Sequence, residues 1–120
     1  LRELLRQFES RNNVTIVTNL DDVDQPDSRS LLYRAARELL SNVSKHAKAK
    51  TVTVGLRRDG DRTGLTVADD GVGFDSATVA PSPARGHIGL ASLRVRIETA
   101  GGTMDVSSKP GVGTRVTVTL

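Results

Sequence analysis

The apolar residues of this chain follow two different spacings that alternate several times along its length. They recur every three or four residues, as on one face of a helix, in residues 1–12, 31–47 and 90–100. They alternate with polar residues, as in a strand that is buried on one side, in residues 14–20, 51–57, 65–67, 104–106 and 116–120. This order predicts three helices and five strands, and therefore an α/β fold.

Length and composition narrow this prediction to one architecture. The chain has 120 residues, which suits a single domain over residues 1–120. Its only aromatic residues are Phe8, Tyr33 and Phe74, so the core must be built from Val, Leu, Ile and Ala. Such a core suits a sheet covered by helices. We therefore expect a two-layer α/β sandwich.

The breaks between the patterned segments carry turn residues. Asp59-Gly60 and Lys109-Pro110-Gly111 are typical of hairpin turns, and Gly101-Gly102 can take the positive φ that ends a helix. The acidic residues 21–28 are expected to form a loop and a helix start. Residues 74–86 have no sustained period and contain two prolines, which predicts a mobile loop that could act as a lid.

Composition also excludes several classes of protein. The chain has no cysteine, which excludes disulfides and thiolate metal sites and favours a reducing, cytoplasmic setting. No apolar run approaches the roughly 18 to 20 residues of a membrane span, so we expect these residues not to be membrane-inserted. The net charge is +3, but the basic residues are scattered among 14 acidic ones and few aromatics are present, so nucleic-acid binding is not expected. Because Leu1 opens the chain inside a predicted helix, we expect a fragment of a longer protein, which could carry a membrane anchor elsewhere.

Four short segments between these elements carry polar or glycine residues. On the second predicted helix, Glu38, Asn42 and Lys45 share one face, which suits either a metal-nucleotide site or an exposed face with favourable charge spacing. After the third predicted strand, Asp69-Asp70-Gly71-Val72-Gly73 offers a carboxylate beside a flexible backbone, or simply an Asp-Gly turn. An Asp at this strand end can accept a hydrogen bond from the exocyclic amine of adenine.

The other two segments contain further glycines. Gly86-His87-Ile88-Gly89-Leu90 leads into the third helix, whose unpaired N–H groups could hold a phosphate, although the glycines also suit a flexible loop. Gly111-Val112-Gly113-Thr114 opens the last strand and could equally be an ordinary hairpin turn.

Together and in this order, the segments resemble the ATP-binding catalytic domain of two-component sensor histidine kinases, of the superfamily that holds gyrase, Hsp90 and MutL. ELLSNVSKHA at 38–47 resembles the N box of that family, and VADDGVGF at 67–74, GHIGL at 86–90 and GVGT at 111–114 resemble its three glycine boxes. The N box and the short lid are most similar to the branch that signals to response regulators with helix-turn-helix output domains. The resemblance implies a Bergerat-type sandwich, with a mixed sheet of about five strands packed on three helices.

The resemblance also implies a role for each matching residue. Asn42 would coordinate Mg²⁺, and Lys45 and His46 would contact phosphates or ribose of ATP. Lys45 would also act in catalysis, by stabilising charge on the γ-phosphoryl group. Asp69 would accept the adenine amino group, with Thr114 supporting the base or a bridging water. Glu38 would position the nucleophile or accept a proton. The remaining nucleotide-binding residues would be Gly71, Gly73, Gly86, His87, Gly89, Leu90 and Gly113.

Both histidines, His46 and His87, lie within these segments, so neither sits in a helical phosphoacceptor motif. The resemblance therefore implies a kinase catalytic domain whose phosphoacceptor and dimerisation helices lie outside this chain. The expected partners are that domain, a response regulator and, in the full-length protein, a second copy. We expect the isolated chain to bind Mg-ATP without phosphorylating itself.

Other members of the superfamily remain as alternatives. An anti-sigma-factor-type serine kinase shares the fold, and a degenerate module could keep the fold only to bind a partner. A gyrase-like or MutL-like ATPase would need further domains and a longer lid. One residue departs from the family pattern, because Asp70 stands where Asn is frequent. Its charge would repel phosphates unless it points outward or is paired.

Overall fold

Helices and strands follow one another in the order that the apolar spacings predict. The computed structural model describes residues 2–12, 14–20, 26–44, 49–72 and 88–120. Its elements are α1 (Arg2–Asn12), β1 (Thr15–Leu20), α2 (Pro26–Asn42), β2 (Thr51–Asp59), β3 (Arg62–Asp69), α3 (Ile88–Thr99), β4 (Thr103–Lys109) and β5 (Gly113–Thr119). The expected lid falls in residues 73–87, outside the described residues.

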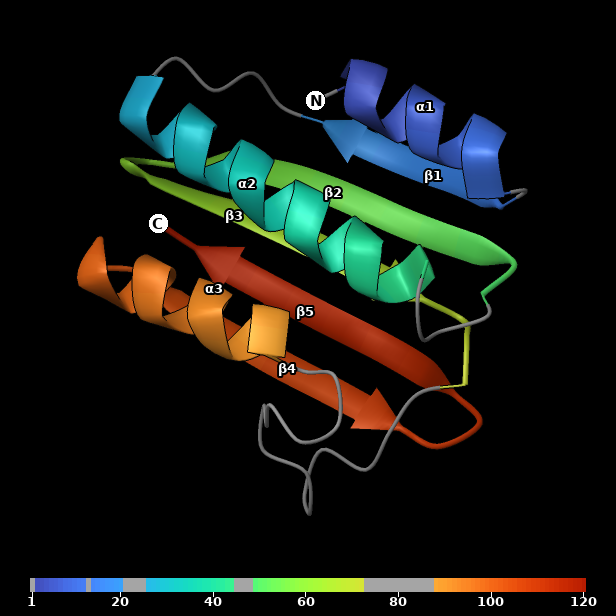
Figure 1. Cartoon of the computed structure of the whole chain (residues 1–120). Coiled ribbons are helices and arrows are strands. Elements are labelled where there is room, and N and C mark those ends of the chain that lie inside the picture. The colour runs from blue at the N-terminus through green and yellow to red at the C-terminus, as the bar shows by residue number, and fades with distance from the viewer. Residues whose placement is uncertain (1, 13, 21–25, 45–48, 73–87) are drawn as a thin grey trace.

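The five strands form one mixed sheet in the order β1-β2-β3-β5-β4. Strand β1 pairs with β2 in parallel, whereas the pairs β2–β3, β3–β5 and β4–β5 are antiparallel. Helices α2 and α3 lie side by side on one face of this sheet, and α1 lies along β1 at its edge (Figure 1). The predicted two-layer sandwich is therefore confirmed.

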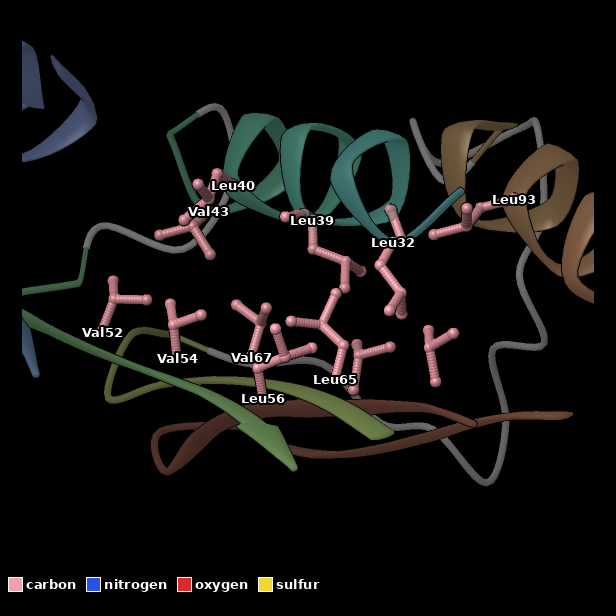
Figure 2. Close-up of a cluster of buried hydrophobic side chains, with 14 of the residues drawn as sticks. Leu32, Leu39, Leu40, Val43, Val52, Val54, Leu56, Leu65, Val67 and Leu93 are labelled. Carbon is pink, nitrogen blue, oxygen red and sulfur yellow. The ribbon is translucent and has the colours of Figure 1, made fainter. Parts of the chain in front are cut away.

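The core fills the space between the helices and the sheet. Figure 2 shows leucines of α2, among them Leu32 and Leu39, directed toward the side chains of β2 and β3. Leu65 and Val54 are fully buried there. Each such aliphatic side chain contributes about 1.5–3 kcal/mol by leaving water. Val and Leu alternate with Thr along the strands, which is why only one face of the sheet joins the core.

Helix α2 begins within the stretch that the sequence predicts to hold its start. It begins at Pro26, inside the stretch that was expected to be a loop and helix start, because a proline at the first helical position lacks only an N–H that would have no partner there. The regular α-helix ends at Asn42, and Val43 and Ser44 continue it in π-helical geometry. The predicted continuation to Ala47 falls in residues 45–48, outside the described residues. A π-type turn next to Asn42 is notable because such turns are frequent at functional sites.

The two glycines after α3 serve different purposes. Gly101 has a φ of 86° and ends the helix, as predicted. Gly102 does not have a positive φ. A Cβ atom there would overlap the Thr119 carbonyl oxygen and lie 2.7 Å from Cδ2 of Leu120. The absence of a side chain at Gly102 therefore lets the end of α3 approach the end of β5.

Within the described residues, the helices lack the combination of length and apolar character that crossing a membrane requires.

Candidate functional site

Several of the segments singled out in the sequence meet at one end of the sandwich. Helix α2 and strand β3 end there, and the turn between β4 and β5 lies at the same end (Figure 1). The first turn of α3 points toward this end as well. Residues more than 70 positions apart in the chain, from Asn42 to Thr114, are thereby brought to one end of the molecule.

Asp69 is the last residue of β3 and lies in the middle of the sheet. It pairs with Val52 on one side and with Thr114 on the other, so its side chain lies on the same sheet face as the buried Val52. The backbone N–H of Gly71 donates to its Oδ1 over 2.9 Å. This bond holds the carboxylate in a fixed direction.

Burial raises the pKa of Asp69, and the neighbouring Asp70 charge raises it further, while the backbone N–H groups of Gly71 and Thr114 oppose the rise. The carboxylate therefore sits in surroundings that supply fewer hydrogen-bond donors than water does. An additional N–H donor from a ligand would stabilise its charged form. Such a half-buried acceptor at the end of a strand suits recognition of an amino group.

Position 113 requires a glycine because its backbone lies against that of Asp69. Its φ is 129°, and a Cβ atom at this position would overlap the Asp69 carbonyl oxygen and lie 3.2 Å from Cα of Asp70. The start of β5 thus runs against the backbone of the residue that carries the acceptor. A side chain at this position would displace Asp69.

Strand β4 adds a buried hydroxyl group beside Gly113 and Thr114. Ser108 Oγ donates to the Gly113 carbonyl oxygen over 3.1 Å and lies 2.8 Å from Thr114 Oγ1. Ser108 is 5% exposed. None of the sequence motifs contains Ser108, although one signal was present: Ser108 continues the two-residue alternation of Met104 and Val106, at a position where a buried polar residue is unusual.

Asp70 is oriented differently from Asp69. It is exposed, and its Oδ1 accepts hydrogen bonds from the backbone N–H groups of Lys50 and Thr51 at 2.9 and 3.0 Å. These two bonds hold the pKa of Asp70 below its ordinary value. The second carboxylate of the Asp-Asp pair is thus hydrogen-bonded to the backbone that enters β2, so its charge is paired, as a carboxylate near phosphates requires.

The exit of β3 is tied directly to the β4–β5 turn. The N–H of Gly111 donates to the carbonyl oxygen of Val72 over 2.7 Å. Together with the bonds of Asp70, this links the entrance of β2, the exit of β3 and the β4–β5 turn by backbone contacts. The backbone next to Asp69 and Thr114 is therefore held by hydrogen bonds to β2 on one side and to the β4–β5 turn on the other.

On α2, Glu38 and Asn42 share one helix face and are both partly buried. Among the residues that the structure describes, the side-chain nitrogen Nδ2 of Asn42 is buried without a hydrogen-bond partner. A buried amide atom with no partner costs about 1–3 kcal/mol, and such groups call for an explanation. The nitrogen and oxygen of an Asn amide exchange places by rotation of the amide group, so Asn42 fits a role as an oxygen ligand of a hard cation such as Mg²⁺.

The remaining predicted site residues stand as follows. Gly89 and Leu90 lie in the first turn of α3, and the Leu90 side chain is part of the core. A contact from Leu90 to a ligand would therefore come from its backbone. Outside the described residues are Lys45, His46, Gly73, Gly86 and His87.

The sequence matches the family model described as histidine kinase-, DNA gyrase B-, and HSP90-like ATPase over residues 27–120. Among curated proteins, it is 38% identical over 120 residues to the sensor histidine kinase NarS of Mycobacterium tuberculosis. It is 34% identical over 125 residues to the signal transduction histidine-protein kinase/phosphatase UhpB of Salmonella typhimurium. Both alignments cover the whole chain, which spans 28% and 23% of the length of these two relatives.

Solved structures of histidine kinases have the same fold. The histidine kinase domain of a blue-light activated histidine kinase from Erythrobacter litoralis matches with a TM-score of 0.78 at 22% identity, covering 98% of this chain and 56% of that one. The histidine kinase AdeS of Acinetobacter baumannii matches with a TM-score of 0.76 at 16% identity, covering 98% and 59%. The described architecture and the sequence match agree, and the chain belongs to the histidine kinase-, DNA gyrase B- and HSP90-like ATPase family.

Proposed function

We propose that this chain binds Mg-ATP and presents the γ-phosphate for transfer to a histidine on a separate dimerisation domain, in two-component signal transduction. The observation that carries the proposal is Asp69, a half-buried carboxylate whose direction is fixed by Gly71 and whose backbone is closely approached by Gly113. Family membership and the likeness to sensor histidine kinases support it.

Asp69 would recognise the adenine base through a hydrogen bond. A carboxylate is an acceptor only, so it pairs with the 6-amino group of adenine and repels the carbonyl oxygen that guanine carries at the same position. Thr114, the neighbour of Asp69 across the sheet, would lie against the same edge of the base. Gly71 and Gly113 would allow the base to come close to the backbone.

The phosphates would lie toward the end of α2. Asn42 would hold Mg²⁺, which supplies positive charge next to the phosphate oxygens when it is bound. Glu38, one turn earlier on the same face, would orient the attacking group or accept its proton. In this proposal Lys45 and His46 add contacts to phosphates or ribose, and Gly73, Gly86, His87, Gly89 and Leu90 complete the pocket.

The chain would act as one domain of a longer protein. A histidine nitrogen of the partner domain attacks the γ-phosphorus, the bond to the bridging β-oxygen breaks, and ADP leaves. The catalytic contribution of this chain is then to position ATP and to stabilise charge. We further propose a cytoplasmic location, a homodimer in the full-length protein, and a response regulator with a helix-turn-helix output domain as the final acceptor.

Calorimetric titration tests the nucleotide site. ATP should bind saturably, more tightly with Mg²⁺ than without it, and more tightly than GTP. Asp69→Asn should weaken ATP binding about tenfold or more because it removes a charged hydrogen-bond acceptor. The matched control is Asp105→Asn, which removes an exposed carboxylate on β4 and should leave the affinity unchanged. Equal ATP affinity in Asp69→Asn and the parent chain would remove this residue from base recognition.

Labelling with γ-labelled ATP tests whether the phosphoacceptor histidine lies on another domain. After incubation of the isolated chain with γ-labelled ATP, we expect no label on His46 or His87. Label retained on either histidine would overturn the proposal that the acceptor lies on another domain.

A further inference from the structure

We infer that Ser108 is a positioning residue that fixes the Thr114 hydroxyl as a hydrogen-bond acceptor and thereby increases selectivity for a nucleotide with an exocyclic amino group. This inference deepens the proposed function and rests on it. It assigns a specificity role to a residue on β4 that none of the recognised motifs contains.

Two hydrogen bonds of Ser108 carry the assignment of the Ser108 and Thr114 hydroxyl protons. Its Oγ lies 3.1 Å from the Gly113 carbonyl oxygen and 2.8 Å from Thr114 Oγ1. A hydroxyl has one proton, and a carbonyl oxygen can only accept. Either hydroxyl could donate in the second bond, and we assign the Ser108 proton to the Gly113 carbonyl oxygen, which makes Thr114 the donor to Ser108. This uses the only proton of the Thr114 hydroxyl.

Thr114 is consequently left with lone pairs toward any further partner. It pairs with Ser108 on one side and with Asp69 on the other, so the three side chains form one row on the helix-covered face of the sheet. Directly opposed residues on neighbouring strands have Cβ atoms about 4.5–5.5 Å apart. Asp69 and Thr114 thus present two acceptors next to each other.

Two neighbouring acceptors match a group that offers two N–H bonds. The 6-amino group of adenine is such a group, and it can reach Thr114 directly or through one water. A carbonyl oxygen at the same position would meet two acceptors and gain no hydrogen bond. Without Ser108, the Thr114 hydroxyl can turn its proton toward the ligand and donate to that carbonyl oxygen.

The burial of Ser108 makes this arrangement stable. At 5% exposure its hydroxyl has little access to bulk water, so the bonds to Gly113 and Thr114 do not compete with solvent. The neighbouring Ser107 is exposed and provides a matched control, since Ser107→Ala deletes the same hydroxyl from the same strand.

The test compares ATP with inosine triphosphate, which differs from ATP in carrying a carbonyl oxygen in place of the amino group and a proton on N1. Both nucleotides are titrated into the parent chain and into Ser108→Ala, Ser107→Ala and Ser108→Thr. We expect Ser108→Ala to lower the preference for ATP about three- to tenfold, the range for one neutral hydrogen bond. Ser107→Ala should keep the preference, and Ser108→Thr should restore it because the hydroxyl is retained.

A double variant shows whether Ser108 acts through Thr114. If it does, Thr114→Val should lower the preference at least as much, and adding Ser108→Ala to it should cause no further loss. Equal weakening of both nucleotides by Ser108→Ala, or full additivity in the double variant, would overturn the inference. The proposed function fails separately, when the parent chain binds neither nucleotide.

Discussion

The β2–β3 and β4–β5 hairpins reverse the chain in similar ways but differ in what surrounds their turns. They lie at opposite ends of the sheet (Figure 1). Gly60 and Gly111 have φ values of 63° and 77°, and a Cβ atom at either position would meet nothing within 4 Å. The β4–β5 turn has a second glycine with positive φ, Gly113, whose missing side chain makes room for Asp69.

The two ends also differ in how their buried polar residues are used. Thr63 lies next to the β2–β3 turn, and its backbone N–H and carbonyl groups pair with those of Leu120. Ser108 precedes the β4–β5 turn, and its side chain bonds to Gly113 and Thr114. Among the glycines of the two hairpins, Gly60 and Gly111 only reverse the chain, whereas Gly113, at the candidate site, allows a close approach of two backbones.

The largest effect is expected for Gly113→Ala. The new methyl group would overlap the Asp69 carbonyl oxygen, and its backbone would be strained at a φ of 129°. We expect the free energy of unfolding to fall by about 3 kcal/mol and ATP binding to be lost with it. Chemical denaturation measures the first and calorimetric titration the second.

Two matched variants separate the cost of backbone strain at a positive φ from the cost of displacing Asp69. Gly60→Ala and Gly111→Ala also put a side chain on a positive-φ residue, but in open space, and should each cost about 1 kcal/mol. Both should bind ATP like the parent chain. If Gly60→Ala were as damaging as Gly113→Ala, the contact with Asp69 would not explain the requirement for glycine.

A substitution at Asn42 is expected to have a smaller effect on the free energy of unfolding, and one of opposite sign. Asn42→Leu keeps the approximate size of the side chain and removes the buried amide nitrogen, which has no hydrogen-bond partner within the described part of the chain. The free energy of unfolding should rise by about 1 kcal/mol, while the Mg²⁺-dependent part of ATP binding disappears. Parallel denaturation and titration experiments with and without Mg²⁺ check both parts.

The control for Asn42 comes from the other end of the sheet. Thr63→Val also replaces a buried polar side chain with an apolar one, on strand β3 next to the β2–β3 turn. It should leave the Mg²⁺ dependence of ATP binding unchanged. A loss of stability in Asn42→Leu would mean that the amide is satisfied in the folded chain, and would remove the reason to place an ion there.

The fold was predictable from the sequence because local signals agreed with long-range packing. The alternation at Leu65 and Val67 and the helical spacing from Leu32 to Val43 follow from burial on one face, and both were predicted correctly. The start of α2 was less predictable, since Pro26 follows acidic residues that are also typical of a loop. The change from α-helical to π-helical geometry after Asn42 has no local signal in the sequence.

The candidate site was predictable only in part, for a physical reason. The glycine motifs mark backbone freedom, but which glycine meets which residue depends on strand register, as with Gly113 and Asp69. Ser108 was missed because its importance comes from pairing with Thr114 across two strands. The pairing of Asp70 with Lys50 and Thr51 likewise joins positions about 20 residues apart.

The smallest effect concerns Asp70 and depends on pH. Backbone N–H groups of Lys50 and Thr51 lower its pKa in the folded chain below the ordinary value of 3.8. Because the folded pKa is depressed, the contribution of this carboxylate to stability is present above about pH 4 and is lost as the pH falls through the folded pKa. Asp70→Asn should therefore lower the Tm at pH 7, and the difference from the parent chain should shrink toward pH 3.

The control for Asp70 is Asp61→Asn, which removes an exposed carboxylate at the β2–β3 turn. Comparing the two variants separates the effect of the Asp70 hydrogen bonds from the general loss of one charge. If the Tm difference for Asp70→Asn were the same at both pH values, the two backbone bonds would not stabilise the ionised form, and the link between β2 and the exit of β3 would rest on the Asp70 N–H bond to the Thr51 carbonyl oxygen.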